Sequence, residues 1–328
     1  MNNILSYLRI PFLASSGLAA LGSSLLYFRQ NDIIYPASLL NSRIEVPKPE
    51  DFRLKEAESL YIPTPDGETL HAYYLRPSNA SLRKNITILT FHGNAGNVGH
   101  RLPIAKVLSE SLGCHVFMLE YRGYGLSSGS PDEAGLTIDG QTALDYVRTH
   151  NEMRHTKIVV YGQSLGGAVT IKLVANNFSQ TMNKGTSNDE KPSMAPIAGI
   201  ILENTFLSIR KLIPSIMPPA RFISVLCHQK WNSDETIQTV PANGPPILFL
   251  SGLKDEIVPP TMMRTLYDLC RIKRKTWRTF ENGDHNSTVA EPGYFEAMWE
   301  WLLKEVLNEE EDNTNTQRTD VAKEELWA

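Results

Sequence analysis

Short apolar runs alternate with segments of helical periodicity along most of this chain. Residues 59–77 alternate apolar and polar positions on both sides of the sequence PDGE, which predicts an antiparallel hairpin. Further apolar runs follow, each before a helical or irregular segment: ITILTF, CHVFMLEY, KIVVYG, IAGIILENTF, PPILFLSG and TWRTF. Continuous apolar strands that alternate with helices form a mostly parallel sheet with both faces covered. The pattern therefore predicts one α/β domain over residues 58–307.

Several segments interrupt or flank this alternation. Residues 31–57 predict a connector, residues 179–196 a loop insertion, and residues 308–328, acidic and poor in apolar side chains, a disordered tail. Residues 207–240 begin with apolar positions at helical spacing, interrupted by Pro214, Pro218 and Pro219. We expect this stretch to form a short cap, whose apolar side chains either bind an acyl group or simply pack on the core.

The N-terminal stretch Ile10–Phe28 contains no charged residue and lies between Arg9 and Arg29. At about 1.5 Å per residue, a helix of this length spans about 28 Å, close to the thickness of a bilayer core. This predicts that residues 1–30 form a single-pass membrane anchor. The serines and glycines of the stretch also fit a cleaved signal peptide, and an ordinary helix of the fold is the third alternative.

Composition and charge narrow the classes of partner. The 328 residues are 41% hydrophobic and 21% charged, as in an ordinary globular protein. A formal net charge of −4 gives no electrostatic reason to expect a nucleic-acid partner. Cys114, Cys227 and Cys270 lack the spacing of a metal site, so we expect buried free thiols. A disulfide between two of them stays open only for an extracytosolic domain.

The sequence GQSLG, Gly162 to Gly166, fits the G-x-S-x-G turn that carries a nucleophilic serine between a strand and a helix. The flanking glycines suit this turn because a Cβ at either position would clash across it. The turn would hold the hydroxyl of Ser164 above the sheet. The backbone N–H of Leu165, at the start of the next helix, would face an anion.

A nucleophilic serine needs a base, and the base needs an acid that orients it. His285 follows the last predicted strand, in a loop at the carboxyl edge of the sheet. Asp255 directly follows the strand PPILFLSG, giving the chain order Ser, Asp, His of this hydrolase class. We therefore predict Ser164, Asp255 and His285 as the catalytic residues. The weaker candidates for the acid are Glu256, Asp284 and Glu203.

A second donor to an oxyanion is predicted in the loop HGNAGN. Gly93 and Gly96 allow the backbone there to approach a substrate closely. We assign the donor to the N–H of Asn94, with Ala95 as the alternative, and expect His92 to brace the loop through its side chain. Losing one such donor costs about 10²–10³ in turnover.

Taken together, these motifs resemble those of a known superfamily. The stretches HGNAGNVGHR, EYRGYGLSSGSPDEAGL, YGQSLGGAV, LENTFLS, SGLKDEIVPP and GDHN resemble the α/β hydrolases over roughly residues 58–307. The narrower likeness is to the bud-emergence family of membrane-anchored serine hydrolases, related to α/β-hydrolase domain-containing protein 13. The resemblance implies the α/β-hydrolase fold and a location at the endoplasmic reticulum or another endomembrane.

The predicted activity is hydrolysis of a carboxylic ester or thioester, on lipid-like or acylated substrates at a membrane, without a metal ion or organic cofactor. A neighbouring family with similar motifs removes acyl groups from S-acylated proteins, so a protein S-acyl thioesterase is one alternative. That family is anchored by a cysteine-rich N-terminus, whereas no cysteine precedes Cys114 here. A membrane-anchored scaffold with little turnover is the alternative from another class. The sequence names no protein partner.

Overall fold

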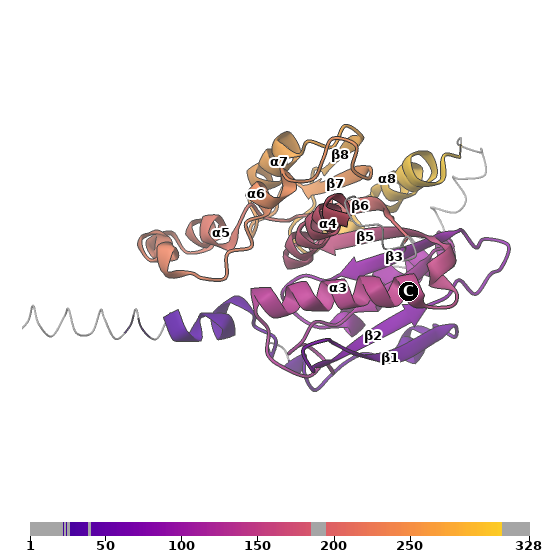
Figure 1. The fold of residues 1–328 in the computed structure, drawn as a ribbon, viewed down its shortest axis with the longest axis horizontal. Helices are drawn as coiled ribbons and strands as arrows, with labels where there is room; N and C mark the ends of the chain where they lie inside the picture. The colour runs from indigo at the N-terminus through magenta and orange to yellow at the C-terminus, as the bar shows by residue number, and fades with distance from the viewer. Residues whose placement is uncertain (1–21, 23, 25–26, 39–40, 185–194, 310–328) are drawn as a thin grey trace, which may run out of the picture.

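The structure is a computed structural model that describes residues 22, 24, 27–38, 41–184 and 195–309 (Figure 1). Its strands are β1 (Ala57–Pro63), β2 (Thr69–Leu75), β3 (Ile86–Phe91), β4 (His115–Leu119), β5 (Lys157–Gln163), β6 (Ile197–Glu203), β7 (Ile247–Gly252) and β8 (Lys275–Phe280). After a helix at residues 27–34, its α-helices are α2 (Leu102–Lys106), α3 (Glu133–Thr149), α4 (Leu165–Lys184), α5 (Ile209–Ile216), α6 (Ser233–Ile237), α7 (Pro260–Leu269) and α8 (Tyr294–Trp301). Shorter 3₁₀ or π turns are η2 (Pro49–Phe52), η3 (Val98–Arg101), η4 (Val107–Ser111), η5 (Met153–His155), η6 (Pro218–Phe222), η7 (Ser224–Leu226), η8 (Thr288–Ala290) and η9 (Leu302–Leu307).

One sheet joins the described strands in the order β1-β2-β4-β3-β5-β6-β7-β8. The predicted hairpin is present, because β1 pairs antiparallel with β2 in a register that opposes Ala57 to Leu75 and Pro63 to Thr69. β2 is also antiparallel to β4, and the pairs from β4 to β8 are all parallel. This confirms the predicted mostly parallel sheet, and it brings the carboxyl ends of β3, β5, β6, β7 and β8 to one edge.

Helices cover both faces of the sheet, as predicted from the continuous apolar strands. One hydrophobic core joins the sheet to α3, α4, α6 and α7. A second core, on the other face, joins it to α2, α8, η4 and η9. Side chains that alternate along the central strands therefore enter two different cores, which explains why strands such as β4 and β7 are buried at every position rather than at every second one.

Two predicted boundaries differ in the structure. α4 continues to Lys184, past Ser179, where the loop insertion was predicted to begin. Pro214 lies inside α5 and does not end it, whereas Pro218 begins the 3₁₀ turn η6. Residues 185–194 of the predicted loop and 310–328 of the predicted tail lie outside the described residues.

The predicted cap segment carries α5, η6, η7 and α6, and Figure 1 shows α5 at the same end of the molecule as the N-terminal helix in indigo. Several of its apolar side chains are exposed, among them Ile216, Met217, Phe222 and Val225. The assignment of this segment as a cap stays a prediction.

The predicted localisation requires a correction. Among the described residues, no helix is both long enough and apolar enough to cross a lipid bilayer. The described residues 27–34 are helical and include the charged residues Arg29 and Asp32. Residues 1–21, 23, 25 and 26 of the predicted anchor lie outside the described residues. We therefore withdraw the single-pass localisation at the endoplasmic reticulum or another endomembrane.

A buried charged cluster ties the hairpin to the loop after β4. The Arg122 Nε donates to Asp139 Oδ1 at 2.9 Å, and its Nη1 donates to Asp66 Oδ2 at 2.7 Å. The backbone N–H of Arg122 also donates to Asp139 Oδ2 at 2.8 Å. The Asp139 side chain is fully buried. Among the described residues, Arg122 is the only cationic residue that forms an ion pair with it. The cluster joins α3, the loop after β4 and the hairpin turn.

Replacing Arg122 with alanine is expected to lower the free energy of unfolding by about 3–5 kcal/mol, because it leaves the Asp139 carboxylate buried without a counter-charge. Urea unfolding measures this loss. Asp66→Asn is the matched control, since Asp66 is partly exposed and its pair contributes about 1 kcal/mol or less. A loss below about 1 kcal/mol for Arg122→Ala would show that Asp139 does not depend on the guanidinium.

Candidate active site

Ser164 occupies a sharp turn between β5 and α4. Its φ of 52° lies in the left-handed region, an uncommon conformation for a residue with a side chain. A Cβ on Gly162 would lie 2.2 Å from Gly166 O, and one on Gly166 would lie 1.9 Å from Phe91 O. Neither neighbour can move away cheaply because both are backbone atoms. Gly162 is therefore required by close approach across the turn, as predicted, whereas Gly166 is required by its close approach to the end of β3.

The three residues predicted for catalysis lie together at the carboxyl edge of the sheet. Ser164 follows β5, Asp255 follows β7, and His285 follows β8. His285 Nε2 lies 3.0 Å from Ser164 Oγ, and His285 Nδ1 lies 2.8 Å from Asp255 Oδ2. The other oxygen, Asp255 Oδ1, accepts the N–H groups of Ile257 and Val258. All three side chains are largely buried, with each residue 7% exposed.

The other carboxyl groups considered for the acid have different partners. Glu203 accepts hydrogen bonds from the hydroxyls of Tyr161 and Tyr294, and burial raises the pKa of its carboxyl. Asp284 caps its own loop, because its Oδ1 accepts the N–H of Ser287 at 2.7 Å, a bond that lowers the pKa of this carboxyl. Glu256 is exposed. Of these four carboxyl groups, only that of Asp255 is within hydrogen-bond distance of the His285 ring.

Asn204 is a site residue that sequence reasoning missed. It follows β6, and its Nδ2 donates to Asp284 O at 3.2 Å and to Thr288 Oγ1 at 3.0 Å. Its Oδ1 accepts the N–H of Gly252, at the end of β7, at 2.9 Å. Asn204 therefore ties the loop of His285 to the strand that precedes Asp255. Its place directly after a strand was the available signal, although spacing alone does not reveal its partners.

The residues predicted to hold an oxyanion flank Ser164. We call residues 92–99 the β3 loop; it leaves the sheet where Phe91 pairs with Gly162. A Cβ on Gly93 would lie 3.6 Å from Ser164 Cβ, so the loop passes directly beside the serine. Leu165 begins α4, where amide hydrogens lack an acceptor within the helix. Asn94 is partly buried and Ala95 is exposed.

His92 and Glu120 brace the β3 loop from within the core. His92 Nε2 lies 3.0 Å from Glu120 Oε1, and both side chains are almost fully buried. Glu120 Oε2 accepts the N–H of Val98 at 2.9 Å, and Tyr121 OH donates to the carbonyl of His92 at 3.0 Å. One buried carboxylate therefore contacts both ends of the loop. The sequence predicted that His92 acts as a brace, whereas its partner was found only in the structure.

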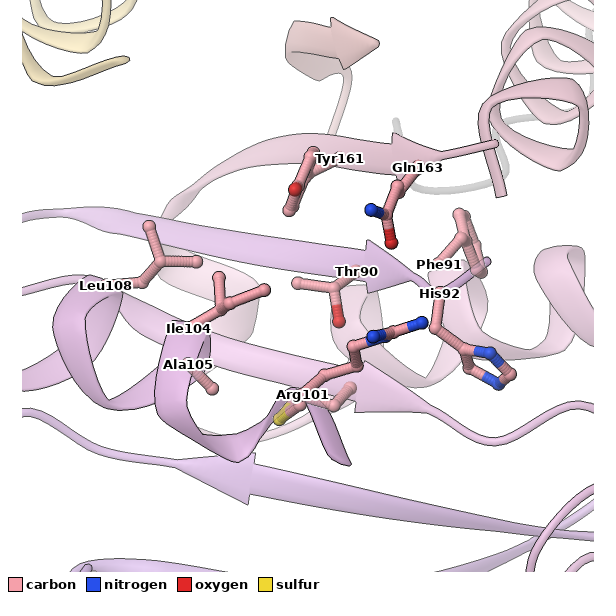
Figure 2. A pocket seen from close by; sticks show the side chains of 10 residues that line it. Thr90, Phe91, His92, Arg101, Ile104, Ala105, Leu108, Tyr161 and Gln163 are labelled. Carbon is pink, nitrogen blue, oxygen red and sulfur yellow. The ribbon is translucent and has the colours of Figure 1, made fainter. Parts of the chain in front are cut away.

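A small cavity of about 30 Å³ lies behind the β3 loop, and Figure 2 shows the Arg101 guanidinium extending into it between Gln163 and His92. Arg101 Nε is buried and has no hydrogen-bond partner among the described residues, and burial lowers the pKa of the guanidinium. The volume suits a water molecule, whereas a substrate needs a cleft of at least about 300 Å³. The cavity is therefore too small to be the substrate site.

The arrangement of Ser164, His285 and Asp255 is suited to nucleophilic chemistry. A carboxylate can only accept a hydrogen bond, so Asp255 requires the proton of the ring on Nδ1. The unprotonated Nε2 then faces the serine hydroxyl and can take its proton. The predicted oxyanion donors belong to the β3 loop, which passes beside Ser164, and to the first turn of α4, which begins at Leu165.

Comparison with known proteins agrees with the fold. Residues 86–203 match the family model described as the alpha/beta hydrolase fold. The protein bem46 of Schizosaccharomyces pombe is 42% identical over 93% of this chain and 95% of its own length. The alpha/beta hydrolase domain-containing protein WAV2 of Arabidopsis thaliana is 31% identical over 92% of this chain and 95% of its own.

Among solved structures, the esterase PF2001 of Pyrococcus furiosus aligns with a TM-score of 0.60 over 80% of this chain and 97% of its own. At 15% identity, this likeness concerns the fold alone. The sequence similarity to bem46 and WAV2 extends over nearly the whole chain. The chain is therefore a hydrolase-fold protein that belongs to the Bem46-like family of α/β hydrolases.

Proposed function

We propose that this protein is a serine hydrolase that cleaves carboxylic esters or thioesters. The observation that supports this best is the continuous chain of short contacts from Ser164 Oγ through His285 to Asp255, at 3.0 and 2.8 Å. A serine held with positive φ, beside a base that is oriented by a buried carboxylate, has no evident use in packing.

In the proposed mechanism, Ser164 Oγ attacks the substrate carbonyl while His285 Nε2 takes the hydroxyl proton. The carbonyl π electrons move to oxygen, and the N–H groups of Leu165 and Asn94 stabilise the resulting oxyanion. Collapse of this intermediate expels the alcohol or thiol, which receives the proton from His285. A water molecule, activated by His285, then attacks the acyl-serine, releases the carboxylic acid and restores the serine.

We further propose that the substrates are lipid-like or acylated. The exposed apolar side chains of the cap segment, Ile216, Met217, Phe222 and Val225, support this proposal. Exposed apolar surface is costly in water and commonly marks a binding surface. Protein S-acyl thioesterase activity uses the same chemistry and is tested by the choice of substrate.

Labelling with a fluorophosphonate probe tests the proposal. We expect the wild type to be labelled, and Ser164→Ala and His285→Ala to lose labelling. Ser81→Ala and His155→Ala, at exposed positions, are the matched controls and should label like the wild type. Substrate panels that differ only in acyl length, and in oxygen or sulfur at the leaving group, then define the substrate class. A folded wild type that neither labels nor turns over any ester would favour a scaffold.

A further inference from the structure

Residues 31–57 were predicted as a connector, yet Ile34 in this segment contacts the β3 loop beside Ser164. We call residues 27–38 and 41–47 the N-terminal strap. The Asn94 Nδ2 donates to the carbonyl of Ile34 in the strap, and Asn94 Oδ1 accepts the hydroxyl of Tyr124 at 2.7 Å. Both ends of the Asn94 amide group are therefore held, one by the strap and the other by the loop after β4.

The strap follows the β3 loop beyond Asn94. Asn97 is fully buried, and its Nδ2 donates to Ser42 O at 2.9 Å and to Glu45 O at 2.8 Å. A Cβ on Gly99 would lie 2.4 Å from Pro47 O, so the two segments touch through their backbones. The strap thus contacts the β3 loop at Asn94, Asn97 and Gly99.

The same strap is anchored to the cap segment. Tyr35, only 2% exposed, donates its hydroxyl proton to Gln229 Oε1 at 2.9 Å and accepts the indole N–H of Trp231 at 2.8 Å. Gln30 Oε1 accepts the N–H of His228 at 2.8 Å. Burial raises the pKa of the Tyr35 hydroxyl, which keeps it a neutral donor. These bonds connect the cap segment to the strap through buried polar groups.

A third anchor joins the strap to the loop after β4. Arg43 donates to the carbonyl of Gly123 and, through Nη2, to that of Ser127 at 3.2 Å. Tyr35 lies in the first part of the strap, residues 27–38, and Arg43 in the second, residues 41–47, so each part has its own anchor. Both anchors can be weakened by substitutions at Tyr35 and Arg43, which leave the residues of the β3 loop unchanged.

We propose that the N-terminal strap is a positioning element of the active site, which holds the β3 loop so that the Asn94 N–H points at the developing oxyanion. This rests on the function proposed above. Gly93 and Gly96 make the β3 loop intrinsically permissive, and Gly96 has a φ of 80°. An oxyanion donor must lie within about 2.7–3.1 Å of its target, so a permissive loop needs external contacts to keep that geometry.

The test is a double variant of the full-length chain, Tyr35→Phe with Arg43→Ala, which removes the hydrogen bonds of Tyr35 to the cap segment and of Arg43 to the loop after β4 and keeps the Tyr35 ring. We expect kcat for ester hydrolysis to fall about 10- to 100-fold while KM changes by less than about threefold, because a misplaced oxyanion donor weakens binding of the transition state only. Hydrogen exchange of the amides at residues 93–99 is expected to become faster.

The matched control is Tyr267→Phe with Arg76→Ala, which removes the same atoms far from the carboxyl edge that carries Ser164. The Tyr267 carbonyl accepts a hydrogen bond from Lys275, the first residue of β8, and Arg76 follows Leu75, which opposes Val116 near the start of β4. Both positions therefore lie at the amino ends of the parallel strands. If the strap variant loses thermal stability but keeps kcat and the exchange rates, the strap only stabilises the fold and the proposal is wrong. A raised KM with unchanged kcat would also overturn it. If the double variant does not fold, Tyr35→Phe alone, which keeps the ring, decides by the same criteria.

The exchange measurement separates this proposal from the proposed function. A wild type without any ester turnover would contradict the function, yet the exchange rates of the β3 loop would still report whether the strap holds it. Faster exchange in the strap variant than in its control would then support the strap, and equal rates would reject it.

Discussion

Replacing Ser164 with alanine is expected to lower kcat for ester hydrolysis by on the order of a million-fold, the scale seen when the nucleophile of a comparable triad is removed. The physical reason is that no other hydroxyl is bonded to His285 Nε2, which faces Ser164 Oγ at 3.0 Å. Alanine keeps the backbone of the turn and both glycine contacts, so the variant should fold. Single-turnover kinetics with an activated ester measure the loss.

A second substitution makes this prediction sharper. Because Ser164 and His285 act as a unit, the double variant Ser164→Ala/His285→Ala should be about as slow as either single variant. Multiplicative losses would mean that the two side chains work independently. The unfolding midpoint of each variant serves as the control for folding. Retained turnover in a folded Ser164→Ala protein would contradict the proposed nucleophile.

Replacing Asp255 with asparagine is expected to lower kcat by about 10⁴. Asp255 Oδ1 accepts the N–H groups of Ile257 and Val258, so an asparagine would keep its oxygen there and turn its NH₂ toward His285. The ring would then have to accept at Nδ1 and carry its proton on Nε2, where it could no longer take the proton of Ser164. The variant should fold but be slow at every pH at which the wild type works.

Glu203→Gln is the matched control for Asp255→Asn, because it makes the same change of charge at another buried carboxyl next to the site. Glu203 contacts Tyr161 and Tyr294 rather than the His285 ring. We therefore expect kcat to stay within about tenfold of the wild type. A larger loss for Glu203→Gln than for Asp255→Asn would reassign the orienting acid.

Much of the fold could be predicted because its signals are local. The hairpin is encoded by alternation around PDGE, and the strands by unbroken apolar runs. The turn at Ser164 is also local, since Gly162 and Gly166 contact each other across it. Three predictions that relied on local patterns were wrong. α4 continues beyond the end of its apolar pattern, and Pro214 does not interrupt α5. An uncharged stretch was interpreted as a membrane anchor.

The rest of the site depends on partners that lie far apart in the sequence. Asn204 meets Gly252 and Thr288 only because β6 lies next to β7 and the loop after β8 folds back over both. Glu120 reaches His92 because β4 pairs with β3. A buried polar side chain requires a partner, but sequence spacing does not indicate which one it finds.

By itself, then, the sequence determined the order of strands and helices, the turn that presents Ser164, and the residues at strand ends from which a triad could be assembled. These depend on periodicity and on steric contacts between near neighbours. Only the tertiary structure decided that Asp255 rather than Glu203 faces His285, that Glu120 and Asn204 hold the surrounding loops, and that the supposed connector is anchored on Asn94. Those choices depend on the strand order of the sheet, which brings distant buried polar groups within hydrogen-bond distance of one another.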